Sequence, residues 1–328
     1  MPQTILQMVQ NSEMELGLPV SASVFGQSGT TDSTGTQMGA LANRVIDELR
    51  RMNRWTAMQF EYDLVVTPLT NTTGDLVAQS PVIMNIPSTA ALAPWTFAVQ
   101  GPGIPAAARI KSVDSATQIT MTMDNTNTTL LTGQTVQFAQ DTYPMPPGFD
   151  YLNNRTWWDR TNRWELIGPD SPQMDQWHRS GIIVTGPRRH WRQIGPGVGI
   201  YDDQLRFWPA PFDVTNPLQM AFEYLSIYAV NQLGTGITFQ QYFTADTDTP
   251  LLDDQAIVMG IKWMFWEAKG FGAYATLQQR WVDYVDRLAA RDGGAPTLQV
   301  VKHMNPLLIS PNSVQDGFFP GPSGPQGN

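Results

Sequence analysis

The sequence predicts an α+β fold in which a helical core carries a long β-rich insertion and extended terminal arms. Apolar residues recur every three or four positions between residues 36 and 55, and again after residue 246, which indicates helices. Between residues 59 and 230, short alternating runs are broken by Gly, Pro, Asn and Thr, which is typical of strands. We therefore expect an N-terminal helix to pack on a C-terminal antiparallel helical hairpin, with the strands inserted between them.

The first 58 residues divide into an arm and a helix. Residues 1–35 are polar and rich in Gly, Ser and Thr after a short apolar start, so they are predicted to form an extended N-terminal arm. In residues 36–58 one helical face carries Met38, Val45 and Leu49, while most of the charged residues fall on the other face. This helix is the first part of the predicted helical core.

The predicted β-rich region spans residues 59–245. Within it, residues 87–141 carry almost no charge and contain their own candidate strands. Because this stretch begins and ends inside the β-rich region, we expect it to form an inserted small β module that protrudes from the rest.

Residues 246–294 complete the predicted helical core. Asp248 or Thr249 is expected to cap a helix that starts near Pro250, and a short glycine-containing link leads to a second helix. Residues 295–328 are rich in Pro, Gly, Ser and Asn and are predicted to form an extended C-terminal arm. Apolar residues in this arm are expected to dock on a partner, namely Leu307, Leu308, Ile309, Phe318 and Phe319.

Composition excludes several classes of chemistry. The 328 residues include no cysteine and three histidines, none of them at the i, i+4 spacing of a helical zinc pair. The sequence has no G-x-S-x-G, no phosphate-binding loop and no dinucleotide fingerprint. We therefore expect no catalytic residues, no cofactor, no metal site and no enzyme activity.

Charge and hydropathy bear on partners. The formal net charge is −9, which argues against tight binding to a nucleic-acid backbone but allows loose, non-specific passage of DNA. No run approaches the roughly 18 apolar residues that a membrane span needs, so no membrane partner is expected. Charged residues make up 15% of the chain against about 25% in typical proteins, and a charge-poor chain rich in Trp favours large contacts between subunits.

Tryptophan and arginine concentrate between residues 155 and 208. Three interpretations are open: a subunit interface, ordinary core packing with Arg paired to neighbouring acids, and a stacking surface for bases or sugars. The basic run 186–192 could contact DNA or an acidic partner, or form a solvated loop. The interface candidates in this segment are Trp157, Trp158, Arg160, Arg163, Trp164, Arg188, Arg189, Trp191 and Arg192.

An ordered set of segments resembles one family. The segments are residues 37–55, 143–152, 158–163, 166–172, 222–226, 243–254 and 290–296. Together they are similar to the head-to-tail adaptor (connector) proteins of tailed bacteriophages of the short-tailed type. The resemblance covers most of residues 36–298, and residues 87–141 depart from the shorter members of that family.

The resemblance implies a structural protein of the virion neck, made in the cytoplasm of the bacterial host. It implies a homo-oligomeric ring of twelve copies that binds beneath the portal protein, extends the DNA channel and docks a downstream tail or nozzle protein. The C-terminal arm is then expected to insert into the portal.

An alternative function is a virion-associated carbohydrate-binding protein or cell-wall hydrolase of the tail. Glu61, Glu165 and Glu223 would be the acids to test in a hydrolase, which needs two carboxylates roughly 5–10 Å apart. Trp95 in the β module would be the candidate sugar-stacking residue.

Overall fold

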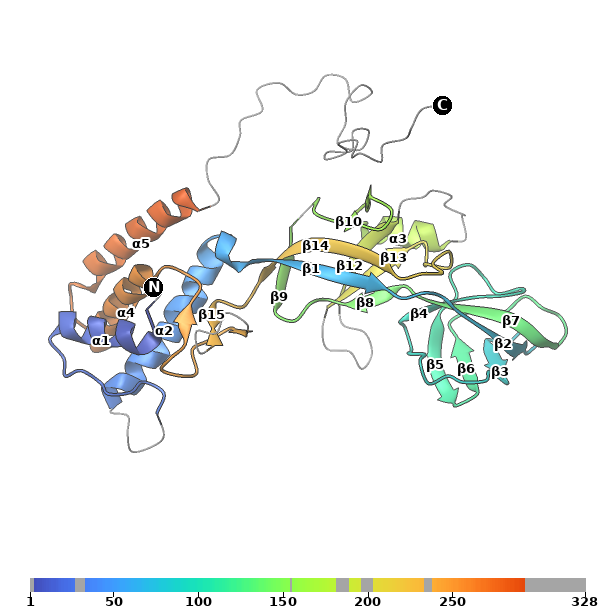
Figure 1. The fold of residues 1–328 in the computed structure, drawn as a ribbon, viewed down its shortest axis with the longest axis horizontal. Helices are drawn as coiled ribbons and strands as arrows, with labels where there is room; N and C mark the ends of the chain where they lie inside the picture. The colour runs from blue at the N-terminus through green and yellow to red at the C-terminus, as the bar shows by residue number, and fades with distance from the viewer. Residues whose placement is uncertain are drawn as a thin grey trace, which may run out of the picture. The chain divides into compact units, whose positions relative to one another are not determined.

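The structure is a computed structural model that describes residues 3–26, 33–153, 155–180, 189–195, 203–232 and 238–292. These residues form two units, each with its own contacts. The helical unit contains residues 3–61, 147–153 and 223–292, and the β unit contains residues 62–146 and 155–222, both within the described ranges. Figure 1 labels most elements of both units.

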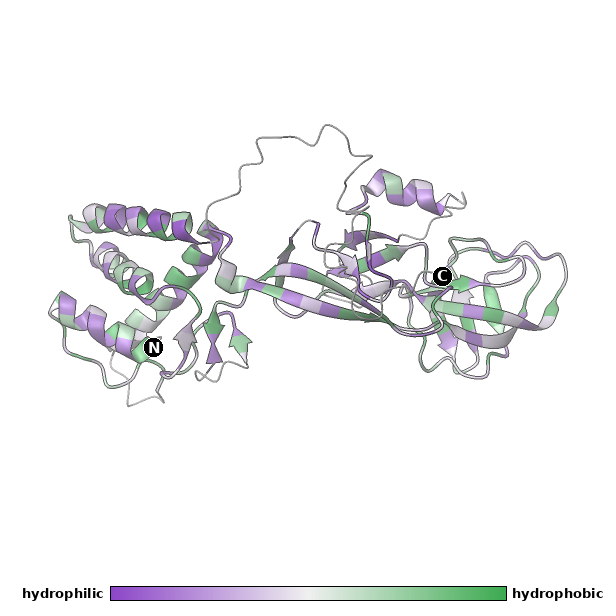
Figure 2. Cartoon of the chain, turned by 45° about the horizontal axis from the view of Figure 1, so that its top comes forward, coloured by the Kyte–Doolittle hydropathy of each residue, from purple (hydrophilic) through white to green (hydrophobic). Residues whose placement is uncertain are grey.

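Four α-helices surround the core of the helical unit. Helix α4 packs against the other three, and its residues Ile257, Ile261 and Met264 are fully buried. Figure 1 shows α5 alongside α4, and Figure 2 shows hydrophilic residues along much of α5. The helices are α1 (Ile5–Leu16), α2 (Ser33–Met52), α4 (Asp254–Lys269) and α5 (Tyr274–Arg291), with a short 3₁₀ turn at Thr56–Met58.

Helix α1 corrects the prediction for the N-terminus. The predicted extended arm is wrong over residues 5–16, which form a helix with both ends capped. Thr4 and Gln7 make a reciprocal capping box, and Gly17 closes the helix in the left-handed conformation (φ 70°). The buried face holds Ile5 and Met8, so α1 belongs to the core of the helical unit.

Asp253, and not Asp248 or Thr249, caps helix α4. The Asp253 carboxylate accepts a hydrogen bond from the Ala256 N–H at 2.9 Å. Asp248 is fully buried and its Oδ2 instead accepts the N–H groups of Thr244 and Ala245 at 2.8 and 2.9 Å. Thr249 lies in a short strand, so the helix begins several residues later than its sequence suggests.

A six-stranded antiparallel sheet dominates the β unit and closes almost completely on itself. Strand order is β4-β7-β2-β3-β6-β5, and the outer strands meet where Ala98 pairs with Arg109 and the Val99 N–H donates to the Ala108 carbonyl at 2.9 Å. Its interior is lined by residues such as Leu76, Ile83 and Phe138. The strands are β2 (Thr70–Leu76), β3 (Val82–Met84), β4 (Phe97–Gln100), β5 (Ile110–Ser115), β6 (Gln118–Met121) and β7 (Leu131–Gln140).

Residues 87–141, predicted as a separate module, supply β4 to β7 of this barrel. The remaining two strands, β2 and β3, come from residues before Pro87. The β2–β7 pairing runs from Thr70–Phe138 to Leu76–Leu131. Residues 87–141 therefore share one sheet with residues 70–84.

Two further sheets contribute to the β unit. A three-stranded sheet has the order β12-β13-β8, and β12 and β13 are paired along their whole length from His190–Trp208 to Ile194–Gln204. A five-stranded sheet has the order β1-β14-β10-β11, with β9 also paired to β14. Their strands are β1 (Gln59–Val66), β8 (Thr142–Pro144), β9 (Phe149–Leu152), β10 (Trp158–Asp159), β11 (Trp164–Glu165), β12 (His190–Ile194), β13 (Gln204–Trp208) and β14 (Leu218–Ser226).

Strands β1 and β14 each belong partly to both units. In the β unit, β10 pairs with the first part of β14, and in the helical unit, β9 pairs with its last part. The helical unit also holds the small sheet β16-β15-β17, formed by Phe239–Gln240, Val230–Asn231 and Thr249–Pro250.

The predicted fold class is wrong. Among the described residues, four antiparallel sheets include a nearly closed barrel, and only five α-helices are present. Four of these helices pack into one of the two units and the fifth lies in the other, so they do not form a core onto which an insertion is added. The prediction placed the core of the fold in the helices, whereas the β-rich region has its own buried apolar cluster.

Candidate interaction surface

Residues 155–180, here called the tryptophan segment, carry the exposed tryptophans of this protein. All eleven tryptophans lie within the described residues, and Trp158, Trp164 and Trp177 are the ones that are 38%, 39% and 48% exposed. Ile167 and Met174 in the same segment are also exposed. Large exposed apolar side chains that gather in one short segment are typical of protein–protein contacts.

The β10–β11 hairpin holds two of these tryptophans in place. Trp158 pairs with Glu165, and Asp159 pairs with Trp164, so the two indoles project from opposite faces of the hairpin. The buried Asp159 carboxylate closes the turn by accepting hydrogen bonds from the Asn162 backbone and side chain at 2.9 and 2.8 Å. The hairpin therefore presents both rings from a fixed backbone.

The predicted candidates Trp157 and Trp191 lie in the core of the β unit. The Trp157 ring stacks between Trp191, at 4.5 Å between centroids, and Phe222, at 3.8 Å. Trp157 and Trp191 are 0% and 1% exposed, so both rings are buried inside the unit and are not on its surface. Trp157 directly precedes strand β10, and successive side chains of an extended chain face opposite sides, which explains why Trp157 is buried while Trp158 is exposed.

Helix α3 (Pro172–Arg179) presents the third exposed tryptophan. Ser171 caps the helix by accepting the Met174 N–H at 3.2 Å. Met174 and Trp177 are exposed three positions apart, while Asp175 and His178 are buried on the opposite face. Met174 and Trp177 are not among the interface candidates predicted from the sequence, although their i, i+3 spacing after a capping Ser171-Pro172 pair is a usable signal.

The candidate arginines differ in their surroundings. Arg163 is exposed and takes a left-handed backbone conformation (φ 60°) in the hairpin turn. Arg160 pairs with Asp63 at 2.9 Å on the surface, whereas the buried Arg189 donates to Asp213 and to the Pro209 carbonyl.

Arg192 binds a buried carboxylate. Its Nη1 donates to Asp175 Oδ2 at 2.8 Å, and Arg179 Nε donates to the other oxygen of that carboxylate at 3.2 Å. These pairs match the interpretation in which arginines satisfy neighbouring acids, while Arg163 remains available at the surface. The other candidates, Arg188, Leu307, Leu308, Ile309, Phe318 and Phe319, lie outside the described residues.

A buried charge cluster joins the barrel to the β12-β13-β8 sheet within the β unit. Arg109 Nη2 donates to the carboxylate of Asp141, to Thr142 Oγ1 at 2.6 Å and to the Trp95 carbonyl at 2.6 Å. Arg109 and Asp141 are 3% and 2% exposed. Burial raises the pKa of Asp141, and the positive charge of Arg109 opposes that rise.

Arg206 adds a further positive charge to this cluster. Burial, together with the charges of Arg109 and Arg179, lowers the pKa of Arg206 to about 9. Arg206 therefore remains protonated at neutral pH, and its Nε donates to Thr142 Oγ1 at 3.4 Å.

A cavity of about 270 Å³ borders the tryptophan segment. Arg155, Glu165 and Gly168 line it together with Trp157, Leu166, Ile167 and Trp191. Glu165 is the single carboxylate among these lining residues, whereas a glycosidase needs two. Glu61 and Glu223 are exposed and belong to the helical unit, and Trp95 is half-buried with its carbonyl bound to Arg109.

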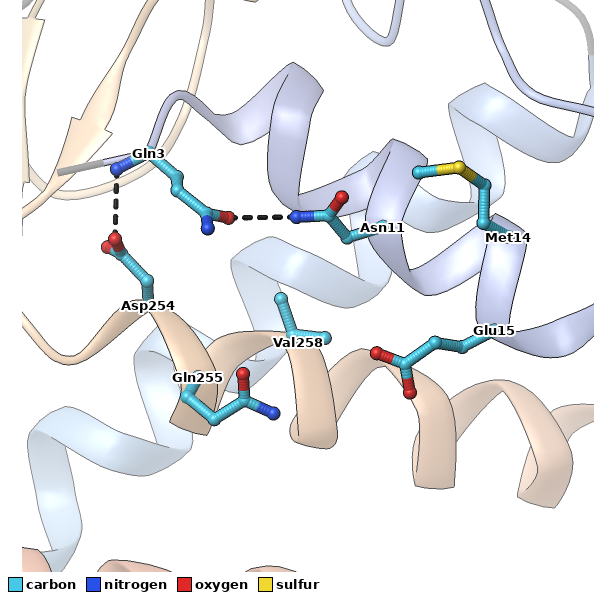
Figure 3. A pocket seen from close by; sticks show the side chains of 7 residues that line it. All are labelled: Gln3, Asn11, Met14, Glu15, Asp254, Gln255 and Val258. Atoms are coloured by element: carbon cyan, nitrogen blue, oxygen red, sulfur yellow. Dashed lines mark hydrogen bonds between the residues drawn. The ribbon is translucent and has the colours of Figure 1, made fainter. Parts of the chain in front are cut away.

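A second cavity, of about 180 Å³, lies between α1 and α4 in the helical unit (Figure 3). The Gln3 N–H donates to Asp254 Oδ2 at 2.9 Å, and Asn11 Nδ2 donates to Gln3 Oε1 at 3.0 Å. Burial raises the pKa of Asp254, and the hydrogen bond from Gln3 opposes that rise. Three of its polar residues already bind one another, so we interpret this cavity as the interface between two packed helices.

Comparison of the chain with protein-family models gives no match, and neither does comparison with curated proteins. Within the described residues, no helix combines the length and the apolar character that a bilayer crossing requires.

Proposed function

We propose that this chain is a structural virion protein, a head-to-tail adaptor that forms a ring under the portal, extends the DNA channel and docks the tail. The order of its sequence segments suggests this function. The observation that carries it is the tryptophan segment, with three exposed indoles on a capped helix and a closed hairpin.

Such a segment suits permanent contact with another protein. Tryptophan and arginine dominate the binding energy of protein interfaces, and rigid side chains lose little conformational entropy on binding. Trp158 and Trp164 stand on opposite faces of a hairpin with Arg163 in its turn, so a partner that encloses the hairpin would meet an aromatic ring on each face beside a positive charge. Residues that hold an uncommon backbone conformation, as Arg163 does, concentrate at functional sites.

The test is assembly with the portal protein of the same phage. Full-length protein is mixed with portal rings, and the mass and copy number of the complex are measured by native mass spectrometry and electron microscopy. We expect as many adaptor copies as portal subunits. A stable ring whose copy number differs from that of the portal would refute the proposal.

A matched pair of variants locates the contact. Each truncated hot spot costs about 2 kcal/mol, a factor of roughly 30, so the double variant Trp158→Ala/Trp164→Ala should weaken incorporation by a factor of roughly 1,000 when the two losses add. The control Phe271→Ala removes a 50% exposed aromatic ring from the helical unit and should incorporate normally. Equal incorporation of both variants would exclude the tryptophan segment as the contact.

A further inference from the structure

Two histidines and an aspartate that are separated in the sequence converge in the β unit. Asp170 precedes helix α3, His178 lies in the last turn of that helix, and His190 opens strand β12. One ligand atom from each of the three residues lies within 4.8 Å of the other two. His190 Nδ1 is 3.0 Å from Asp170 Oδ1, and His178 Nδ1 is 3.2 Å from Asp170 Oδ2.

His178 holds a buried nitrogen without a hydrogen bond. Its side chain is 3% exposed, and its Nδ1 makes no hydrogen bond among the described residues, although Asp170 Oδ2 is close by. The geometry of this approach does not align a donor with an acceptor, so the distance alone gives no bond. A buried polar atom left without a partner costs free energy, and a metal ion would supply the missing partner.

The distances fit a coordination polyhedron. Zinc binds histidine nitrogen and carboxylate oxygen at about 2.0–2.2 Å, so the edges of a tetrahedral site are about 3.3–3.6 Å long. The two nitrogen–oxygen distances of 3.0 and 3.2 Å approach that length. Asp170 has one oxygen toward each histidine, so small rotations would bring one oxygen and both nitrogens around a common centre.

Neighbouring groups restrain the three side chains. The His178 and His190 rings meet edge to face, 4.7 Å apart with an interplanar angle of 70°, and the Trp208 ring is parallel to His178 at 6.4 Å. The Asp170 N–H donates to the Trp191 carbonyl at 2.9 Å, which ties the aspartate to strand β12. Restrained ligands of this kind favour metal binding because their side chains lose less conformational entropy when the ion binds.

We propose that Asp170, His178 and His190 bind one divalent transition-metal ion, with Zn²⁺ the best match to this donor set. Two imidazoles and one carboxylate are the ligand types that zinc prefers, and neither Ca²⁺ nor Mg²⁺ favours imidazole. The ion would tie helix α3, with its exposed Met174 and Trp177, to strand β12. Three protein ligands leave one tetrahedral position for water.

The first experiment uses the full-length protein after treatment with a chelator. Co²⁺ is added as a spectroscopic substitute for Zn²⁺, and we expect visible absorption bands of tetrahedral strength that saturate at one ion per chain. Zn²⁺ should displace the Co²⁺ and raise the melting temperature, because a ligand that binds only the folded state stabilises it. Absence of these bands would mean that the histidines form a metal-free pair with Asp170, and the proposal would be wrong.

Variants distinguish this site from adventitious binding. His190→Gln and Asp170→Asn should each weaken Zn²⁺ binding by more than about 100-fold, which exceeds the loss caused by an outer-sphere partner. His303→Gln removes the one histidine outside the cluster and should bind Zn²⁺ like the original chain. Asp170→Asn keeps the size of the side chain, so it serves if His190→Gln fails to fold, as judged by circular dichroism. Equal affinity in Asp170→Asn and the original chain, or loss of binding in His303→Gln, would overturn the proposal.

Discussion

Replacing Arg109 by methionine should destabilise the β unit strongly at neutral pH. The change removes the cation from a pair whose two side chains are 4% and 3% exposed. Deletion of one partner from a buried ion pair costs about 3–5 kcal/mol, because the remaining charge has no compensation. Asp141 would keep a hydrogen bond from the Thr142 hydroxyl at 2.9 Å, so we expect a loss near the lower end, about 3 kcal/mol.

The loss of folding stability in Arg109→Met should depend on pH. Burial already raises the pKa of Asp141, and loss of the Arg109 charge would raise it further. A carboxyl group with a raised pKa in the folded state binds more protons there than in the unfolded chain. The stability of Arg109→Met should therefore increase as the pH falls from 7 toward 5, and the difference from the original chain should narrow.

The assay is urea unfolding at several pH values, followed by tryptophan fluorescence and by far-ultraviolet circular dichroism. Because the two units can unfold in separate transitions, the free energies of unfolding are compared for the transition that the substitution shifts. Arg160→Met is the matched control: it breaks an exposed pair with Asp63 in the same unit, and should cost less than about 1 kcal/mol. A loss below about 1 kcal/mol in Arg109→Met, or equal losses in both variants, would refute the argument.

Two further predictions concern the helical unit. Gly260→Ala should lower the melting temperature, because an added Cβ would lie 2.5 Å from a Val45 methyl group and overpacking costs about 1–3 kcal/mol. The control Gly272→Ala has open space around the added Cβ and should melt within about 1 °C of the original chain. Burial alone would raise the pKa of Asp246, but hydrogen bonds from Ser23 and two backbone N–H groups lower it overall. Asp246→Asn should therefore be less stable at pH 7, and acid titration of the melting temperature should show that deficit disappearing as the pH falls below about 4.

Long helices could be predicted from the sequence, whereas the short helix α1 could not. Helices α2, α4 and α5 span 20, 16 and 18 residues, over which a helical period is unmistakable. Helix α1 has 12 residues, and Glu13 on its buried face resembles a surface residue in the sequence. That carboxylate is satisfied by the Ser21 N–H at 2.7 Å and by the Ser21 hydroxyl, contacts that no local pattern reveals.

The fold class was wrong because periodicity identifies elements and not how they pair. Strands β2 and β7 are neighbours in the barrel although residues 77–130 separate them along the chain. The same limit applies to the metal-ligand candidates. The i, i+4 pattern detects only histidines one helical turn apart, but His178 and His190 converge from a helix and a strand, which only the tertiary structure brings together.

The near-closure of the six-stranded sheet limits how neighbouring copies of this chain can pair through their backbones. A strand at an open edge displays unpaired amide and carbonyl groups, and an identical chain nearby can pair with them regardless of its side chains. Here β4 and β5 meet at Ala98 and Arg109, so few such groups remain available. Copies of this chain held close together could therefore recognise one another through this sheet mainly by side-chain chemistry, which single substitutions can tune.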